Sequence, residues 1–233
     1  MKRSQIFACL FLILVGLSLQ ACATTHSAKS IEAWVVDAET NQPLEGVIVV
    51  AHWQLERKFA YPPGVTGYDP RGPLQLKVLE TVTDPQGRFY FPAWGPLVAP
   101  PGAYLEGFDP QIILFKPGYE YEWFANQHFA PINSSISSTR TSWVNGTTIK
   151  LKKFEGDLKG YADALTLLHG EVDFATNNCD WKPIPRMLVA LDKQARLFRE
   201  AKVYSSLQTI DYITQDPRGQ CGSAQEIFKD YLK

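Results

Sequence analysis

The stretch VTDPQGRFYFP, Val82 to Pro92, decides how this sequence is read, because it joins two apolar runs through a short polar segment. Asp84 and Pro85 are residue types that begin tight turns. Gly87 supplies a backbone conformation that residues with a side chain avoid. The acid Asp84 and the base Arg88 could suggest a catalytic site, but the order of residue types around them predicts the corner of a β-sheet.

The residues after this turn alternate between apolar and polar side chains. Phe89 and Phe91 are two residues apart, so on a strand they share one face, which is suited to a core. Arg88 and Tyr90 then share the other face, towards solvent or the rim of the second sheet. We expect the segment before the turn, residues 74–83, to pair with the segment after it, residues 88–94, as a β-hairpin.

Other runs have the same β-branched and aromatic character, and Gly, Pro, Asn or Asp ends each of them. Together with the expected hairpin they give about seven strands, and frequent turns between short strands are typical of a β-sandwich. These further expected strands cover residues 31–36, 46–53, 110–117, 120–125 and 147–154.

The pattern changes after Phe154, where apolar residues begin to recur at helical spacing. The spacing predicts helices over residues 156–170 and 184–204. A last helix is expected to open at Ser223, with Glu226 reaching back as in a capping box. The expected fold is therefore mainly β, a sandwich over residues 31–154 with long loop insertions, followed by a small α-helical region over residues 155–233.

The N-terminus has the pattern of an export signal. Lys2 and Arg3 precede an apolar run from Ile6 to Leu19, which is too short for a bilayer-spanning helix of roughly 20 residues. The run ends in LQAC, which resembles the lipobox of bacterial lipoproteins. An ordinary signal peptide cut near the same place, with Cys22 an incidental thiol, is the alternative.

The lipoprotein resemblance implies a membrane anchor at a defined residue. Cys22 would carry the lipid after removal of the signal peptide, residues 1–21, and more than one acyl chain makes a stable anchor. Ala23 follows the cysteine where Asp would retain an enteric lipoprotein in the inner membrane, so the outer membrane is the expected location. Residues 22–30 are expected to be a polar tether to the folded domain.

Composition argues against several classes of partner. The whole chain carries 23 basic and 24 acidic residues, and loss of Lys2 and Arg3 with the signal would leave a net charge of about −3. Nucleic-acid binding relies on clustered basic residues and has no support here. The four histidines have no metal-ligand spacing, so we expect no metal and no cofactor; they are His26, His52, His128 and His169.

The cysteines point to a disulfide rather than to a nucleophile. Cys9 leaves with the signal and Cys22 is assigned to lipid, which leaves Cys179 and Cys221 as a pair in an oxidising compartment. The segment around Cys221 has some likeness to the nucleophile of papain-like proteases. That family needs a His and an Asn far downstream of its cysteine, and only twelve residues, none of them His or Asn, follow Cys221.

Aromatic residues near the second long loop, residues 126–146, are the strongest hint of a contact surface. If exposed, they could stack on sugars or contact a partner protein, and the alternative is local packing. These residues are Tyr119, Tyr121, Trp123 and Trp143.

Three segments, taken in order, resemble the carboxypeptidase regulatory-like domain, a transthyretin-like β-sandwich. They are VVDAETNQPLEGVIVVA (35–51), TVTDPQGRFYF (81–91) and ILFKPGYE (113–120). The resemblance covers less than half the chain. It implies a noncatalytic accessory module without shared active residues.

The sequence therefore leads to a noncatalytic, membrane-anchored envelope lipoprotein whose sandwich binds or scaffolds an envelope partner. The alternative is binding of carbohydrate or peptidoglycan by the loop aromatics. An enzyme whose site has no known motif is a third reading, which a deep pocket of converging polar groups would support.

Overall fold

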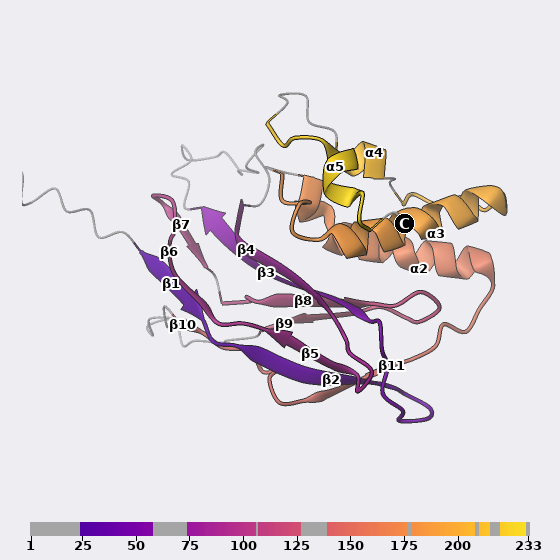
Figure 1. The fold of residues 1–233 in the computed structure, drawn as a ribbon, viewed down its shortest axis with the longest axis horizontal. Coiled ribbons are helices and arrows are strands. Elements are labelled where there is room, and N and C mark those ends of the chain that lie inside the picture. Colours follow the sequence, from indigo (N-terminus) through magenta and orange to yellow (C-terminus); the bar gives the residue numbers. More distant parts are fainter. Residues whose placement is uncertain are drawn as a thin grey trace, which may run out of the picture.

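A computed structural model describes residues 24–57, 74–105, 107–126, 139–176, 179–207, 210–214 and 220–231. Within these ranges, three layers are stacked: two β-layers and one layer of helices (Figure 1). The first β-layer contains the strand orders β10-β1-β6 and β11-β2-β5. Its strands are β1 (Thr25–Ala28), β2 (Ile31–Asp37), β5 (Arg88–Phe91), β6 (Trp94–Val98), β10 (Thr139–Arg140) and β11 (Thr148–Leu151).

The second β-layer has the order β4-β3-β8-β9, and β7 also pairs with β3. Its strands are β3 (Ile48–Arg57), β4 (Leu74–Val82), β7 (Ala103–Leu105), β8 (Gln111–Phe115) and β9 (Glu122–Ala125). All of its pairs are antiparallel, whereas β11 and β10 add to β2 and β1 in parallel. The β-sandwich expected from the sequence is thus present, with eleven strands in the described residues instead of about seven.

Helices cover the outer face of the second sheet. They are α2 (Leu158–Glu171), the 3₁₀ turn η1 (Asp173–Thr176), α3 (Pro185–Glu200), α4 (Ile210–Ile213) and α5 (Ala224–Phe228). The two helices expected from apolar spacing and the one expected to open at Ser223 are confirmed, and Ser223 caps α5 by accepting the Glu226 N–H at 3.4 Å. No described helix has both the length and the hydrophobicity needed to cross a membrane.

Two cores explain why the middle sheet is so apolar. On β8, Ile112 and Leu114 face the core between the sheets, whereas Ile113 and Phe115 face the core under the helices. β3 is covered in the same way on both faces. A strand buried on both faces reads as a continuous apolar run, and IVVA and IILF show that pattern.

The turn at Asp84 is confirmed, but the expected hairpin around it is wrong. Asp84 Oδ1 accepts the Arg88 N–H at 2.9 Å, and Gly87 has φ 71° with Val35 O only 2.3 Å from where a Cβ would lie. However, β4 pairs with β3 and β5 pairs with β2, so this turn carries the chain from one sheet to the other. The alternation of apolar residues is the same for either partner, and therefore it did not reveal the crossing.

The N-terminal segment also differs from the expectation. Residues 25–28, assigned from their polarity to the tether, form β1 between β6 and β10. The strand alternates buried and accessible residues, with His26 and Ala28 buried. Histidine on the inner face made the strand look like a polar linker.

Glu80 on β4 fastens the helical layer to the sheet. Its carboxylate accepts the backbone N–H groups of Met187 at 2.8 Å and Arg186 at 3.0 Å, in the first turn of α3. Ile184, at the N-cap of α3, provides no side-chain cap, so a residue more than a hundred positions away performs this role. Burial raises the pKa of Glu80 to about 7, against the lowering effect of these hydrogen bonds.

We expect Glu80→Ala to lower the free energy of unfolding by about 2 kcal/mol, because the N–H groups of Met187 and Arg186 lose their side-chain acceptor. Urea denaturation at neutral pH measures this change. In Glu80→Gln the side chain no longer titrates. In the wild type, the folded carboxyl keeps its proton up to pH about 7, whereas the carboxyl of the unfolded chain loses it near pH 4.5. The free energy of unfolding of the wild type should therefore fall relative to that of Glu80→Gln as the pH rises from about 4.5 to about 7. A constant difference would contradict the assigned burial.

Candidate functional site

Two chain segments far apart in sequence form the walls of a pocket at one end of the sandwich. After β8 the chain turns at Gly118, and after β11 it leaves the sheet on its way to α2. The two segments run beside each other, because Tyr119 and Lys153 form an isolated antiparallel bridge. The Glu120 N–H donates to Lys152 O at 2.8 Å, and the Phe154 N–H donates to Gly118 O at 3.0 Å.

Helix α2 forms a further wall of the pocket, with Tyr161, Ala164 and Leu165. Asp157 caps its first turn by accepting the Gly160 N–H at 2.7 Å, which fixes where the helix begins. One turn in, the Tyr161 hydroxyl accepts the Gly118 N–H at 2.9 Å. The rings of Phe154 and Tyr161 lie 4.9 Å apart, so the helix and the β8–β9 turn hold each other in place.

The resulting pocket has a volume of about 300 Å³. This volume lies at the small end of the range for ligand sites, and mostly apolar walls are typical of such sites. The lining residues are Tyr119, Glu120, Tyr121, Phe154, Tyr161, Ala164 and Leu165.

Hydrogen bonds to the protein orient two of the tyrosines. The Tyr119 hydroxyl donates to Asp37 Oδ2 at 3.0 Å, and the Tyr161 hydroxyl is held by Gly118 as described. Asp37 also accepts the backbone N–H groups of Thr40 and Glu39, and the bond from Thr40 is the largest cause of its pKa falling to about 2. Asp37 is therefore an ionised structural acceptor that anchors the pocket.

The pocket's phenols are kept in the neutral form. Burial raises the pKa of Tyr119, Tyr121 and Tyr161, and the neighbouring Asp37 raises that of Tyr119 further. A phenol with a raised pKa is a poor nucleophile and a poor general base at neutral pH. The pocket thus offers mainly aromatic rings for contact.

The four aromatic residues singled out from the sequence do not form one surface. Tyr119 and Tyr121 line the pocket, and Trp123 lies outside it with 40% of its surface exposed. On β9, Trp123 is opposite Ile113 and so lies on the helix side of the sheet, whereas Phe124 is opposite Ile112 and packs on the inner core. Trp143 packs edge-on against that Phe124, and its Nε1 donates to Ala125 O at 3.2 Å.

Phe154 is a pocket residue that sequence reasoning missed. The sequence places it at the end of the strand expected over residues 147–154, and Tyr161 falls within the helix expected over residues 156–170. Nothing in the local sequence indicates that either ring lines the same pocket as Tyr119. The three residues come together because the segment after β11 runs beside the β8–β9 turn. The packing of α2 on the second sheet then completes the pocket.

Two buried histidines, His52 and His26, lie among aromatic and charged side chains. His52 stacks on Phe174 with ring centroids 4.3 Å apart and shares a 3.0 Å hydrogen bond with Gln75, and burial lowers its pKa to about 4. His26 is buried near the ion pair of Asp109 and Arg140, where burial and the arginine lower its pKa. In the part of the chain that the structure describes, no three His, Cys, Asp or Glu residues are grouped to hold a metal.

The expected disulfide is present, between Cys179 and Cys221 with their Cα atoms 5.4 Å apart. It ties the segment before α3 to the segment before α5, where Trp181 and Phe228 stack. The thiol of Cys221 is thereby committed to the bond, which removes the protease reading. Cys22, the expected lipid attachment site, lies outside the described residues.

No protein-family model matches this sequence, and no curated protein matches it. Among solved structures it is similar to 3-chlorocatechol 1,2-dioxygenase from Rhodococcus opacus 1CP, with 16% identity and a TM-score of 0.29 over 58% of this chain and 62% of that one. It is also similar to a 9R-lipoxygenase from Cyanothece PCC8801, with 11% identity and a TM-score of 0.22 over 76% of this chain and 28% of that one. The chain thus covers less than two thirds of either enzyme, and likeness of this degree assigns neither a family nor a reaction.

Proposed function

We propose that this protein is a noncatalytic, lipid-anchored envelope protein whose sandwich presents a binding pocket to a partner. The observation that carries the proposal is the pocket between the β8–β9 turn and α2, with its aromatic walls fixed by hydrogen bonds to Asp37 and Gly118. Its phenols stay protonated, so it is suited to contact and not to covalent catalysis.

The fold of this module is proposed to be the transthyretin-like sandwich of the carboxypeptidase regulatory-like domain. Two β-layers packed over one core, and the turn at Asp84 that crosses between them, support that assignment. The resemblance implies a noncatalytic accessory module with no shared ligand and no shared active residues, which is consistent with the neutral phenols.

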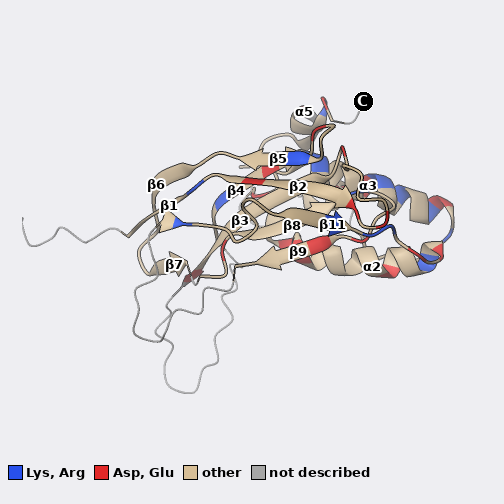
Figure 2. Ribbon diagram, turned by 90° about the horizontal axis from the view of Figure 1, so that it is seen from below, with Lys and Arg blue, Asp and Glu red and all other residues tan. Residues whose placement is uncertain are grey.

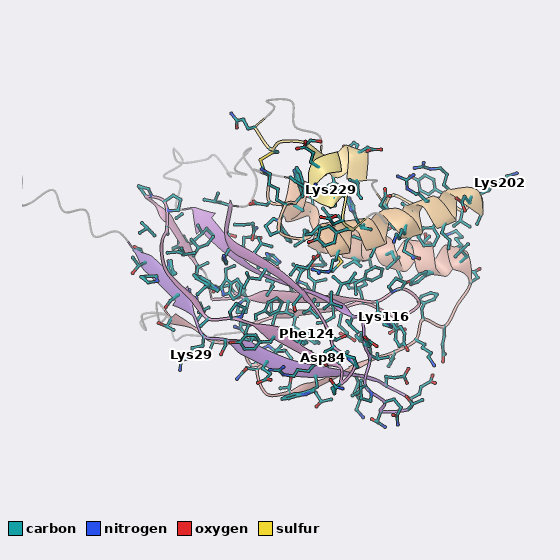
Figure 3. The ribbon with its side chains drawn as sticks, in the orientation of Figure 1. Lys29, Asp84, Lys116, Phe124, Lys202 and Lys229 are labelled. Carbon is teal, nitrogen blue, oxygen red and sulfur yellow. A yellow bond between two sulfur atoms is a disulfide. The ribbon has the colours of Figure 1, made fainter. Side chains whose placement is uncertain are left out.

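β1, which follows the proposed anchor in the sequence, begins at the opposite end of the described structure from the pocket. β1 begins at Thr25, so a lipid on Cys22 is three residues away and at most about 11 Å from the sandwich. In Figure 1, β1 starts at the left, whereas the β8–β9 turn and the beginning of α2 lie at the right. Lys29, after β1, and Lys116, before Gly118, show the same separation in Figure 3. Such an anchor holds the β1 end at the membrane and turns the pocket away from it.

Site-specific photocrosslinking of the full-length protein in its native envelope tests this function. A photoreactive residue in place of Glu120, at the pocket, should give a crosslinked product, whereas one in place of Asp84, at the turn between β4 and β5, should not. Tyr121→Ala in the first protein should remove the product. No product at position 120, or equal products at both positions, would overturn the binding function.

The lipid anchor can be tested in the cells used for crosslinking. Metabolic labelling with a fatty acid should mark the parent protein and leave Cys22→Ala unmarked. An unlabelled parent protein of normal processed size would remove the lipid and keep the pocket. If the crosslinked product is a glycan, the loss of that product in Trp123→Ala would favour the carbohydrate alternative. Trp123 is 40% exposed and lies on the face of β9 that is turned towards the helices.

A further inference from the structure

The pocket offers a ligand aromatic faces more than hydrogen bonds. The Tyr119 hydroxyl donates to Asp37 and the Tyr161 hydroxyl oxygen accepts the Gly118 N–H, so both oxygens already have a partner within the protein. Leu165 is fully buried behind them, and Ala164 beside it has too small a side chain to fill the space. The face of an aromatic ring carries partial negative charge, which attracts a cation.

Acidic side chains gather around these rings. Glu120 lines the pocket, and Glu122 follows it at the start of β9, where Figure 2 shows acidic positions beside α2. Burial and then the charge of Glu120 raise the pKa of Glu122. Burial raises the pKa of Tyr121 as well, followed by the charges of Glu171 and Glu122. The charges of Glu171 and Glu122 thus oppose further negative charge near Tyr121, and a positive group would relieve that repulsion.

The basic residues near the pocket do not cancel this charge. Lys153 Nζ lies 3.7 Å from Asp37 Oδ2 and is paired with that ionised carboxylate. Lys152 acts on Glu122 and lowers its pKa, but the rise caused by burial and by Glu120 is larger. Near the pocket, the charges of Glu120, Glu122 and Glu171 are thus offset only in part by Lys152.

We propose that the pocket binds a small organic cation, an alkylammonium group of the size of choline, between its aromatic rings and its acidic rim. This inference rests on the proposed function, because it takes the pocket to be a binding site and names the class of its ligand. A volume of about 300 Å³ suits one compact group rather than a large ligand. The rings supply the cation–π contact and Glu120 with Glu122 supplies the long-range attraction.

Titration with two ligands of equal shape and different charge tests the inference. Choline and 3,3-dimethyl-1-butanol differ only by nitrogen in place of a carbon, so their affinities for the full-length protein isolate the charge. Isothermal titration calorimetry, supported by NMR of the tyrosine rings, should show choline binding about 3- to 30-fold more tightly. n-Butylammonium and a blocked lysine amide, used as further probes, distinguish a small-molecule cation from a side chain of a peptide.

Variants separate the rings from the carboxylates. Glu120→Gln with Glu122→Gln should lower choline affinity several-fold, leave the alcohol unchanged and weaken the salt dependence. Tyr121→Leu should remove the preference for the cation. Glu200→Gln, an exposed acid at the end of α3, is the matched control and should change nothing.

The outcomes distinguish this inference from the proposed function. Equal affinity for choline and for the alcohol would overturn the cation assignment and keep the pocket as a binding site. No binding of any probe to the folded wild type would also overturn it, while crosslinking at position 120 would still decide the proposed function. If the double glutamine variant bound choline as the wild type does, the acidic rim would have no role.

Discussion

Arg140→Ala is expected to lower the free energy of unfolding by about 3–5 kcal/mol, because it leaves a buried carboxylate without its partner. Arg140 Nε donates to Asp109 Oδ2 at 2.7 Å, and both side chains are less than 5% exposed. The same guanidinium donates to Leu105 O at 2.9 Å. Arg140 lies on β10 beside β1, so the variant should also loosen the N-terminal strand. Urea denaturation and hydrogen exchange of β1 amides measure both effects.

A double variant provides the control for this prediction. Arg140→Leu with Asp109→Leu removes both charges. The double variant should therefore lose less free energy of unfolding than Arg140→Leu and Asp109→Leu lose when their separate losses are added. Acid should also help Arg140→Ala: burial already raises the pKa of Asp109, and loss of the arginine raises it further. The variant's deficit should then shrink as the pH falls and the folded carboxyl takes up a proton. A cost below about 1 kcal/mol for Arg140→Ala would mean that the pair behaves as an exposed salt bridge.

Removing the disulfide should have an effect of similar size on the helical layer. Cys179 and Cys221 are 42 positions apart, and closing a loop of that length stabilises by about 4 kcal/mol in the chain-entropy model. The double variant Cys179→Ser with Cys221→Ser should therefore unfold at lower urea concentration. The loss should be concentrated at α5, whose Phe228 stacks on Trp181 with ring centroids 5.6 Å apart.

Reduction of the wild type checks the same prediction without a mutation. Reduced wild type and the double serine variant should have equal midpoints, and reduction should leave the variant unchanged. Signals from the sandwich, such as those of the buried Trp53, should move much less than those of Trp181. A double variant within about 1 kcal/mol of the oxidised wild type would show that the helices pack equally well without the bond.

Local patterns were enough to predict a large part of this fold. The faces of Phe89 and Phe91, the turn at Asp84, and the starts of α2 and α5 depend on a few neighbouring residues. The disulfide followed from counting cysteines. Short strands were missed where the pattern is weak: β7 has three residues and β10 has two, and two or three residues are too few to establish an alternation.

Of the candidate site, the sequence indicated only part. Tyr119 and Tyr121 stood out as aromatics near a long loop, but Trp143 was grouped with them and lies elsewhere, against Phe124. Phe154 was not expected at the pocket. Residues two apart on one strand share a face, so Tyr119 and Tyr121 could be grouped from the sequence, whereas Phe154 reaches the pocket only because its segment returns beside the β8–β9 turn.

The sequence by itself determined where the longer strands and the helices of this protein lie, which face of Phe89 and Phe91 is apolar, and where the chain turns at Asp84. Only the tertiary structure decided that β4 and β5 belong to different sheets, that residues 25–28 extend the first β-layer, and that Glu80 caps α3. The pocket belongs to the second group. Alternation and capping are properties of neighbouring residues, so a single segment shows them. The choice of a partner strand depends on burying both faces of β3 and β8 at once, and no single segment contains the information for that choice.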